Sequence, residues 1–483
     1  MFDFSRSELP VAVIGAGPVG LAAAAHLVQR KIPVVVIEQG EAIAANLDDY
    51  RHVRLFSPWR YNIDHAARAL LEARGWTTPP LDRLPTAGEV IDEYLVPLSQ
   101  HPAIANGLQL NARVTQITRA GFDKLKTAGR EKAPFVLRVD HADGELDIRA
   151  QAVIDASGTW NQPNPLGANG LFAPGEVGAS EQIAYGMPDV LGRDRQRYAG
   201  KRVLVVGAGH SAVGTLIVLA TLAESEPATR IVWAIRGSNL ALIIGGGDAD
   251  GLPARGALGK RLQALVDAGR LELHDSFRIA QVQREGSKLR VVAEPDQSSE
   301  TSIADVDEII GATGSRPNLL MASQLRLKLD AWLESTEQLA PLIDPNVHSC
   351  GSVRAHGHRE LAHPEVGYYA IGAKSYGRAP NFLMATGYEQ ARSVVAAIAG
   401  DIAAADDVQL ELPETGVCRA SFAPTLVAAA DGGCCGGPAP AKVAACCATD
   451  AEAKEAGAEG CGCGPKPTVR MPVAIRVRAG CCA

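Results

Sequence analysis

A glycine pattern near the N-terminus sets the strongest limit on how this chain can fold. The segment VAVIGAGPVGLAAAAHLVQRKIPVVVIEQG predicts a strand, a tight turn, a helix and a second strand, at 11–14, 15–17, 18–29 and 34–37. Gly15, Gly17 and Gly20 give the turn its G-x-G-x-x-G spacing. The first glycine permits the turn, the second lets the backbone approach a pyrophosphate, and the third lets helix and strand pack closely. The segment therefore predicts a dinucleotide-binding unit.

The residue that ends the second strand supports this prediction. Glu38 stands where a carboxylate can accept hydrogen bonds from ribose hydroxyls, and the helix N-terminus offers unpaired N–H groups to phosphates. The glycine spacing alone is a weak signal, and a glycine-rich turn without a ligand is the alternative. The two strands, the helix and the acid together make the signal specific.

A second copy of the pattern occupies residues 202–236. Gly207, Gly209 and Ala212 form G-x-G-x-x-A, and the following strand, expected at 231–235, ends on Arg236 rather than on an acid. An arginine there would pair with a ribose 2′-phosphate that an acid would repel. We therefore expect this site to prefer NADPH to NADH, the alternative being a solvated arginine at a strand end.

Two further apolar segments run into turns of small residues, AVIDASGTW at 152–160 and EIIGATGSRPN at 308–318. With both glycine motifs, they resemble the flavoproteins that have two dinucleotide-binding domains, which include flavin-containing monooxygenases and pyridine-nucleotide disulfide reductases. The resemblance covers about residues 8–402. It implies an α/β fold with two Rossmann-like domains, FAD at the first motif, NADPH at the second, and the NADPH domain inserted into the FAD domain.

The domain boundaries follow from this arrangement. We expect an FAD-binding domain at 1–194 and 306–412, an NADPH-binding domain at 195–305 and a tail at 413–483. A strand at 368–371 and a helix at about 381–399 would complete the FAD site, with the helix N-terminus facing the flavin by resemblance. The family usually has an aspartate after that strand. Here GAKSYG has no acid, so Lys374, Ser375 or backbone atoms are expected to replace it.

The cysteine distribution bears on the reaction class. Disulfide reductases of this superfamily keep a cysteine pair beside the flavin, but residues 38–65 and 195–305 contain no cysteine. The monooxygenase branch needs none, because the cofactor carries the chemistry while the protein binds, orients and excludes water. The F-x-G-x-x-x-H pattern of many such enzymes is absent. No catalytic acid or base can be assigned from the sequence.

Several other residues are candidates for the site, each with a structural alternative. The loop at 243–259 either closes over the nicotinamide or is a surface loop. The histidines at 356, 358 and 363, with Glu360 and Glu365, suggest a metal site, a proton donor near the flavin or a solvated loop. Trp59 and Trp160 either wall the flavin or pack in the core.

The C-terminal segment is rich in alanine, glycine, proline and cysteine, with few large apolar residues to offset chain entropy, so we expect a flexible, disordered tail. Its paired cysteines are Cys434, Cys435, Cys446, Cys447, Cys461, Cys463, Cys481 and Cys482. None forms the C-x-x-C pair typical of zinc or iron–sulfur sites. Vicinal thiols suit a large, soft ion instead.

The tail also resembles that of mercuric reductases, which deliver their ion with a C-terminal cysteine pair. The segments SYGRAPNFLMATGYEQ and YAGKRVLVVGAGHSA resemble flavoproteins of arsenic-resistance gene clusters. These resemblances imply a monooxygenase-like enzyme that oxidises a trivalent arsenical or similar thiophilic substrate captured by the tail. The alternatives are a reductase of a metal ion or external disulfide, a thiol-rich metalloid-sequestering protein, and a tail without a role.

Charge and hydropathy limit the classes of binding partner that we expect. The net charge of -7 disfavours nucleic acid, and the apolar run at 11–27 is short and broken by glycine and proline, so no membrane span is expected. Cysteines concentrated outside the body of the chain do not form a secreted disulfide framework. We expect a cytoplasmic enzyme acting on a small molecule or metalloid, and the sequence carries no signal for an oligomeric state.

Overall fold

The computed structural model describes residues 9–240, 243, 253–294, 302–348 and 353–410. Within them lie two parallel five-stranded sheets and two antiparallel three-stranded sheets. The strands of the first parallel sheet, in spatial order, are β16 (Tyr368–Ala370), β7 (Ala152–Asp155), β1 (Val11–Ile14), β2 (Val34–Ile37) and β3 (Leu108–Gln109). Those of the second are β11 (Glu272–His274), β10 (Arg230–Ala234), β9 (Arg202–Val206), β15 (Glu308–Gly311) and β8 (Ile183–Tyr185).

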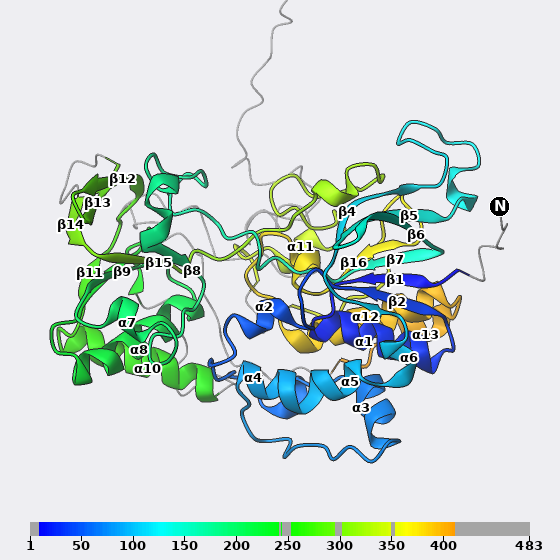
Figure 1. Cartoon of the computed structure of the whole chain (residues 1–483), viewed down its shortest axis with the longest axis horizontal. Helices are drawn as coiled ribbons and strands as arrows, with labels where there is room; N and C mark the ends of the chain where they lie inside the picture. Colours follow the sequence, from blue (N-terminus) through cyan, green and yellow to red (C-terminus); the bar gives the residue numbers. More distant parts are fainter. Residues whose placement is uncertain (1–8, 241–242, 244–252, 295–301, 349–352, 411–483) are drawn as a thin grey trace, which may run out of the picture. The chain divides into compact units, whose positions relative to one another are not determined.

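The first parallel sheet lies between helices and a small antiparallel sheet (Figure 1). Along β1, Val11 and Val13 pack into one apolar cluster with α1 (Pro18–Gln29) and α12 (Met384–Ile398), whereas Ala12 and Ile14 pack into another with the antiparallel sheet. Successive side chains of a strand point to opposite faces, so a run of four apolar residues fits a strand covered on both sides. The antiparallel sheet comprises β4 (Ala112–Arg119), β5 (Phe135–His141) and β6 (Gly144–Ala150).

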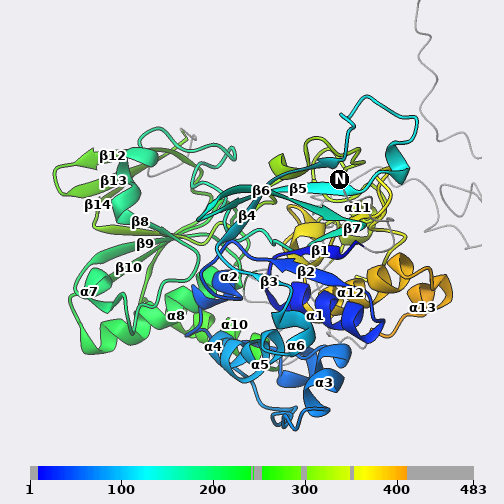
Figure 2. The same ribbon diagram turned by 45° about the vertical axis from the view of Figure 1, so that its right-hand side comes forward.

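The second parallel sheet repeats this layering, as Figure 2 shows. Val203 and Val205 of β9 pack with α8 (His210–Ser225), and Leu204 and Val206 pack toward the second antiparallel sheet. That sheet comprises β12 (Ile279–Glu285), β13 (Lys288–Ala293) and β14 (Ser302–Val306). We call the layers around β1 the β1 unit and those around β9 the β9 unit.

Further helices complete both units. They are α2 (Ala45–Asp48), α3 (His65–Glu72), α4 (Ala87–Val90), α5 (Val96–Ser99), α6 (Pro102–Ala105), α7 (Arg195–Tyr198), α10 (Pro253–Asp267), α11 (Ala340–Ile343) and α13 (Ile402–Asp406). Turns of 3₁₀ or π geometry occupy Trp59–Tyr61, Ile91–Leu95, Arg130–Lys132, Val177–Gln182, Leu320–Ala322 and Gly372–Tyr376. No helix in the described part of the chain is long and apolar enough to cross a membrane.

The chain order confirms the predicted α/β class and the insertion of one dinucleotide fold into the other. All strands of the second parallel sheet lie between β7 and β16, which are neighbours in the first. The boundary expected at residue 195 stays a prediction, and the pairing of β8 with β15 favours an earlier one. The predicted tail at 413–483 lies outside the described residues, together with its eight paired cysteines.

Candidate functional site

A cavity of about 460 Å³ lies at the carboxyl ends of β1, β2 and β7. Ligands of open parallel sheets bind at this edge. Its lining includes three of the four residues predicted for the first dinucleotide site, Gly15, Gly17 and Glu38. The fold therefore brings these three predicted residues together around one cavity.

The three glycines of the first motif have different structural reasons. Gly15 has φ +96°, and a Cβ there would lie 2.8 Å from the Ala156 carbonyl oxygen. A Cβ at Gly20 would lie 1.9 Å from the Gly15 carbonyl oxygen. A Cβ at Gly17 would meet no atom within 4 Å. The fold itself needs Gly15 and Gly20, whereas the space beside Gly17 contains no protein atom and is open to a ligand.

Two helices present uncapped N-termini to the cavity. Gly17 is the N-cap of α1 and Leu383 is the N-cap of α12, and neither helix has a side-chain cap or an acidic residue in its first turn. Gly17, Leu383 and Met384 all line the cavity. Free N–H groups and the positive end of the helix dipole favour negative charge there.

Glu38, which the sequence predicts to accept hydrogen bonds from a ribose, lies on the cavity wall. The residue is 7% exposed, and its two carboxylate oxygens accept hydrogen bonds from the backbone N–H groups of Ala16, at 2.8 Å, and Gly40, at 2.9 Å. These bonds fix the carboxylate on the cavity wall. Each carboxylate oxygen has a further lone pair, so the group can still accept from a ligand hydroxyl.

The turn after β16 reaches the cavity through its backbone. Gly372 and Ala373 line the cavity, but Lys374 and Ser375 do not. The Lys374 ammonium is buried beside Asp155, and the Ser375 hydroxyl donates to the Gly372 carbonyl at 2.7 Å. Of the three replacements expected for the missing acid, only backbone atoms contact the cavity directly.

The two candidate tryptophans take different places. Trp160 lines the cavity, where its Nε1 donates to Asp49 Oδ2 at 2.7 Å and its ring lies 4.8 Å from that of Tyr50. Trp59 is fully buried away from the cavity. Tyr50 also lines the cavity, and burial together with the Asp49 charge raises its pKa to about 12, so it stays protonated. Sequence reasoning missed Tyr50 because no motif surrounds it.

The second glycine motif repeats the local geometry of the first. Gly207 has φ +134°, and a Cβ added there would lie 2.2 Å from the Ala312 carbonyl oxygen. A Cβ added at Gly209 would meet no atom within 4 Å. Ala212 is fully buried at the point where α8 packs on β9. Arg236 is exposed, and its guanidinium donates a hydrogen bond to the Ala168 carbonyl oxygen at 3.4 Å. Most of the 243–259 loop lies outside the described residues.

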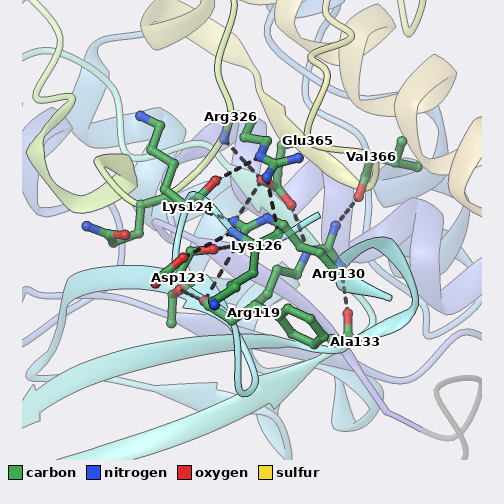
Figure 3. A network of polar contacts seen from close by, with 12 residues as sticks. Arg119, Asp123, Lys124, Lys126, Arg130, Ala133, Arg326, Glu365 and Val366 are labelled. Atoms are coloured by element: carbon green, nitrogen blue, oxygen red, sulfur yellow. Dashed lines mark hydrogen bonds and ion pairs between the residues drawn. The ribbon is translucent and has the colours of Figure 1, made fainter. Parts of the chain in front are cut away.

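The histidine-rich segment does not form one site. His358 Nε2 lies 2.9 Å from Asp406, and His363 Nδ1 accepts from the Lys328 N–H at 3.2 Å. Glu365 lies between Arg119 and Arg130, as Figure 3 shows. None of these side chains lines the cavity, and the described residues contain no group of three or more histidine, cysteine, aspartate or glutamate side chains that could hold a metal.

Comparison with known proteins places the chain in a family. Residues 12–351, more than half of the chain, match the family model described as pyridine nucleotide-disulphide oxidoreductase. The chain is 28% identical over 204 residues to indole-3-pyruvate monooxygenase YUCCA1 of Oryza sativa subsp. japonica. That match covers 41% of this chain and only 42% of the rice protein.

Solved structures show the same fold in enzymes of two kinds. The bacillithiol disulfide reductase of Bacillus cereus superposes with a TM-score of 0.60 at 17% identity, covering 81% of this chain and 99% of that one. The FAD-bound cadaverine monooxygenase of Erwinia amylovora gives 0.58 at 11%, covering 85% and 98%. At such identities the likeness concerns the fold alone, so it does not choose between reductase and monooxygenase.

Proposed function

Because the chain belongs to the pyridine nucleotide-disulphide oxidoreductase family, we propose that it is an oxidoreductase that binds FAD in the cavity of the β1 unit and NADPH at the second glycine motif. The observation that carries the proposal is the open space beside Gly17, at an uncapped helix N-terminus, in a cavity that also contains Glu38. A pyrophosphate, a helix dipole and a ribose-binding acid belong together in a dinucleotide site.

The lining residues fit the parts of FAD. The N-terminus of α1 and Gly17 would hold the pyrophosphate, and Glu38 would hold the adenosine ribose. The N-terminus of α12 would face the flavin ring, where its dipole favours negative charge. When bound, FAD supplies hydride acceptance from NADPH and electron transfer to a second substrate. Trp160 and Tyr50 would shield that end of the cavity from water.

NADPH is the reductant that fits the β9 unit. The α8 N-terminus has no side-chain cap and no acid in its first turn, so it offers the same phosphate-binding geometry as α1. Arg236 follows β10 by two residues and is exposed, so its guanidinium can reach a 2′-phosphate.

A monooxygenase-like reaction is favoured by the positions of the cysteines in the sequence. Disulfide reductases that resemble this chain keep a cysteine pair beside the flavin, in segments that correspond to residues 38–65 or 195–305. Neither segment contains a cysteine here, so neither can supply a dithiol relay. The second candidate, a reductase, is favoured by the eight paired tail cysteines, which could carry electrons to a metal ion or an external disulfide.

The substrate proposal is a trivalent arsenical or similar thiophilic species captured by the tail thiols. It rests on the sequence of the tail and on the resemblance described above. In the reaction with arsenite, one oxygen atom of O₂ would go to arsenic, the other would leave as water, and NADPH would supply two electrons. A metalloid-sequestering protein would bind arsenite in the same way without consuming NADPH.

The test uses the purified full chain with arsenite, under air and under nitrogen. We expect bound FAD, and NADPH oxidation that needs both oxygen and arsenite and matches the arsenate formed. Arsenite-stimulated NADPH oxidation under nitrogen would favour the reductase, and arsenite binding without NADPH oxidation would favour sequestration. A full chain with the eight paired cysteines changed to serine should keep FAD but show a raised KM for arsenite. An unchanged KM for arsenite would contradict a role of the tail thiols in capturing the substrate.

A further inference from the structure

A buried ion pair lies directly behind the cavity wall. Asp155 ends β7, and Lys374 lies in the 3₁₀ turn Gly372–Tyr376 that follows β16. The Lys374 ammonium is 2.6 Å from Asp155 Oδ2, and the two side chains are 1% and 0% exposed. The pair joins the ends of two neighbouring strands whose following turns both contribute to the cavity.

The pair is part of a closed hydrogen-bond network. Asp155 Oδ2 also accepts from the Tyr368 hydroxyl at 3.0 Å, and Oδ1 accepts from the Ser157 hydroxyl at 2.7 Å. Lys374 donates to the same Ser157 oxygen at 3.0 Å. Of these four residues, Ser157 alone lines the cavity. The network therefore ends at one hydroxyl on the cavity wall.

This arrangement sets what the Ser157 hydroxyl can do. The hydroxyl donates its hydrogen to the Asp155 carboxylate, and one of its oxygen lone pairs accepts the hydrogen bond from the Lys374 ammonium. One lone pair is left to accept a hydrogen bond. A hydroxyl that donates to a carboxylate is polarised and becomes a better acceptor, because hydrogen bonds in a chain strengthen one another.

Stability alone is a poor reason for such a pair. Taking two charges out of water costs about as much as their attraction returns, and apolar residues of similar size often serve the fold equally well. The gain here is geometric, because the pair fixes the turn carrying Ser157 against the turn carrying Gly372. Gly372 is itself held by its N–H, which donates to Gln390 Oε1 at 2.8 Å.

We propose that Asp155 and Lys374 are positioning residues that orient Ser157 to accept a hydrogen bond from a sugar or ribityl hydroxyl of the bound dinucleotide. They would thereby do indirectly what the acid missing after β16 would do by contact. The inference rests on the proposed function, since it takes the cavity to hold FAD.

The experiment measures the dissociation constant of FAD, from flavin fluorescence after serial dilution of the holoenzyme. Ser157→Ala should weaken binding about 3- to 10-fold, the range of one hydrogen bond. Asp155 and Lys374 are replaced together, as Asp155→Asn and Lys374→Met, because removing one charge would leave the other buried and unpaired. The double variant should weaken FAD by a similar factor. All three substitutions in one chain should weaken it no further, because the pair acts through Ser157.

Two control variants separate positioning from general damage. Arg378→Met makes the same kind of change four residues from Lys374, in an exposed ion pair with Glu334 that does not line the cavity, and should leave FAD affinity unchanged. Ser157→Thr keeps the hydroxyl and should bind FAD within about 2-fold of the wild type, less than one hydrogen bond is worth. The melting temperature of every variant is measured beside the affinity.

The outcomes are distinct. Equal FAD affinity in Ser157→Ala and the wild type would overturn the inference while leaving the proposed function intact. Multiplied losses in the triple variant, or full affinity in the Asp155→Asn/Lys374→Met variant, would also overturn it. A wild-type chain that binds no FAD would overturn the proposed function and this inference together.

Discussion

The β1 and β9 units build the same turn and differ in what surrounds it. The N-cap of α1, Gly17, has φ and ψ of -79° and -176°, and the N-cap of α8, Gly209, has -85° and 176°. In both units the first glycine has positive φ and lies against a neighbouring backbone carbonyl. In both, the middle glycine faces open space. Similar local sequences therefore give the same turn geometry in both units.

The difference lies at the third position and at the strand end. Gly20 has no room for a Cβ, whereas the β9 unit accommodates the Cβ of Ala212 at the corresponding position. Glu38 is buried and fixed by two backbone N–H groups, whereas Arg236 is exposed. The strand-end residue of the β1 unit is thus held by the backbone, whereas that of the β9 unit faces solvent.

The largest expected effect is on the middle glycines. Gly17→Leu should fold normally, because its Cβ meets nothing, but should retain almost no FAD, because the side chain takes the place of the pyrophosphate. Gly209→Leu should keep FAD and lose NADPH binding. Absorbance at 450 nm per chain and nucleotide titration measure the two losses. A Gly17→Leu chain that kept its flavin would show that the site is misplaced.

Substitutions at the two third positions should both destabilise the fold, but to different extents. Gly20→Ala would place a Cβ 1.9 Å from a backbone oxygen, so we expect a loss of about 3 kcal/mol in the free energy of unfolding, the upper end for overpacking. Ala212→Gly removes a buried methyl group from a helix and should cost about 1 kcal/mol. Urea unfolding of both variants measures this difference. Similar losses in the two would mean that the units pack their helices alike.

Acid should affect the β1 unit through His363. Burial lowers the pKa of His363 from 6.5 to about 4. The unfolded chain therefore binds the proton more tightly than the folded chain, and stability present above pH 6.5 is lost as the pH falls toward 4. We expect a loss of about 2 kcal/mol between pH 7 and 4, below the full linkage value because the ring has some solvent contact.

The matched variant for this prediction is His363→Gln, which can keep an acceptor for the Lys328 N–H. Its unfolding free energy should fall less than that of the wild type over the same pH range. Hydrogen exchange should show β16 losing protection in acid before β9 does. Equal acid sensitivity in the variant and the wild type would contradict a role for His363.

The sequence predicted the motif elements well because their signals are local. The strands at 11–14 and 34–37 and the helix at 18–29 lie where they were expected, and α12 begins three residues later than expected, at Met384. Glycine spacing and runs of β-branched residues depend only on near neighbours. The cavity-lining positions of Gly15, Gly17 and Glu38 followed from the same signals.

The rest of the site depends on contacts between distant residues. Ser157 and Lys374 lie 217 positions apart, and no local pattern indicates that they meet. No local pattern places Trp160 either, because its contacts on the cavity wall are with Asp49 and Tyr50, which are distant in sequence. The sequence left three interpretations of the histidine segment open. Its residues are close in sequence, but their side chains contact separate partners such as Asp406 and Lys328.

The smallest effect is expected for Arg236, which follows β10 by two residues in the β9 unit. Arg236→Ala should weaken NADPH about tenfold, the value of a well-formed arginine–phosphate pair of about 1.4 kcal/mol, with little effect on NADH. The matched control is Arg230→Ala, an exposed arginine at the opposite end of β10 that donates to the Pro227 carbonyl at 2.8 Å. It should leave both nucleotides unchanged, because it lies away from the edge where ligands bind. Nucleotide titrations of the two variants give the ratio of NADPH to NADH affinity. Equal losses for NADPH and NADH in Arg236→Ala would remove the 2′-phosphate contact, and with it the difference in specificity between the two units.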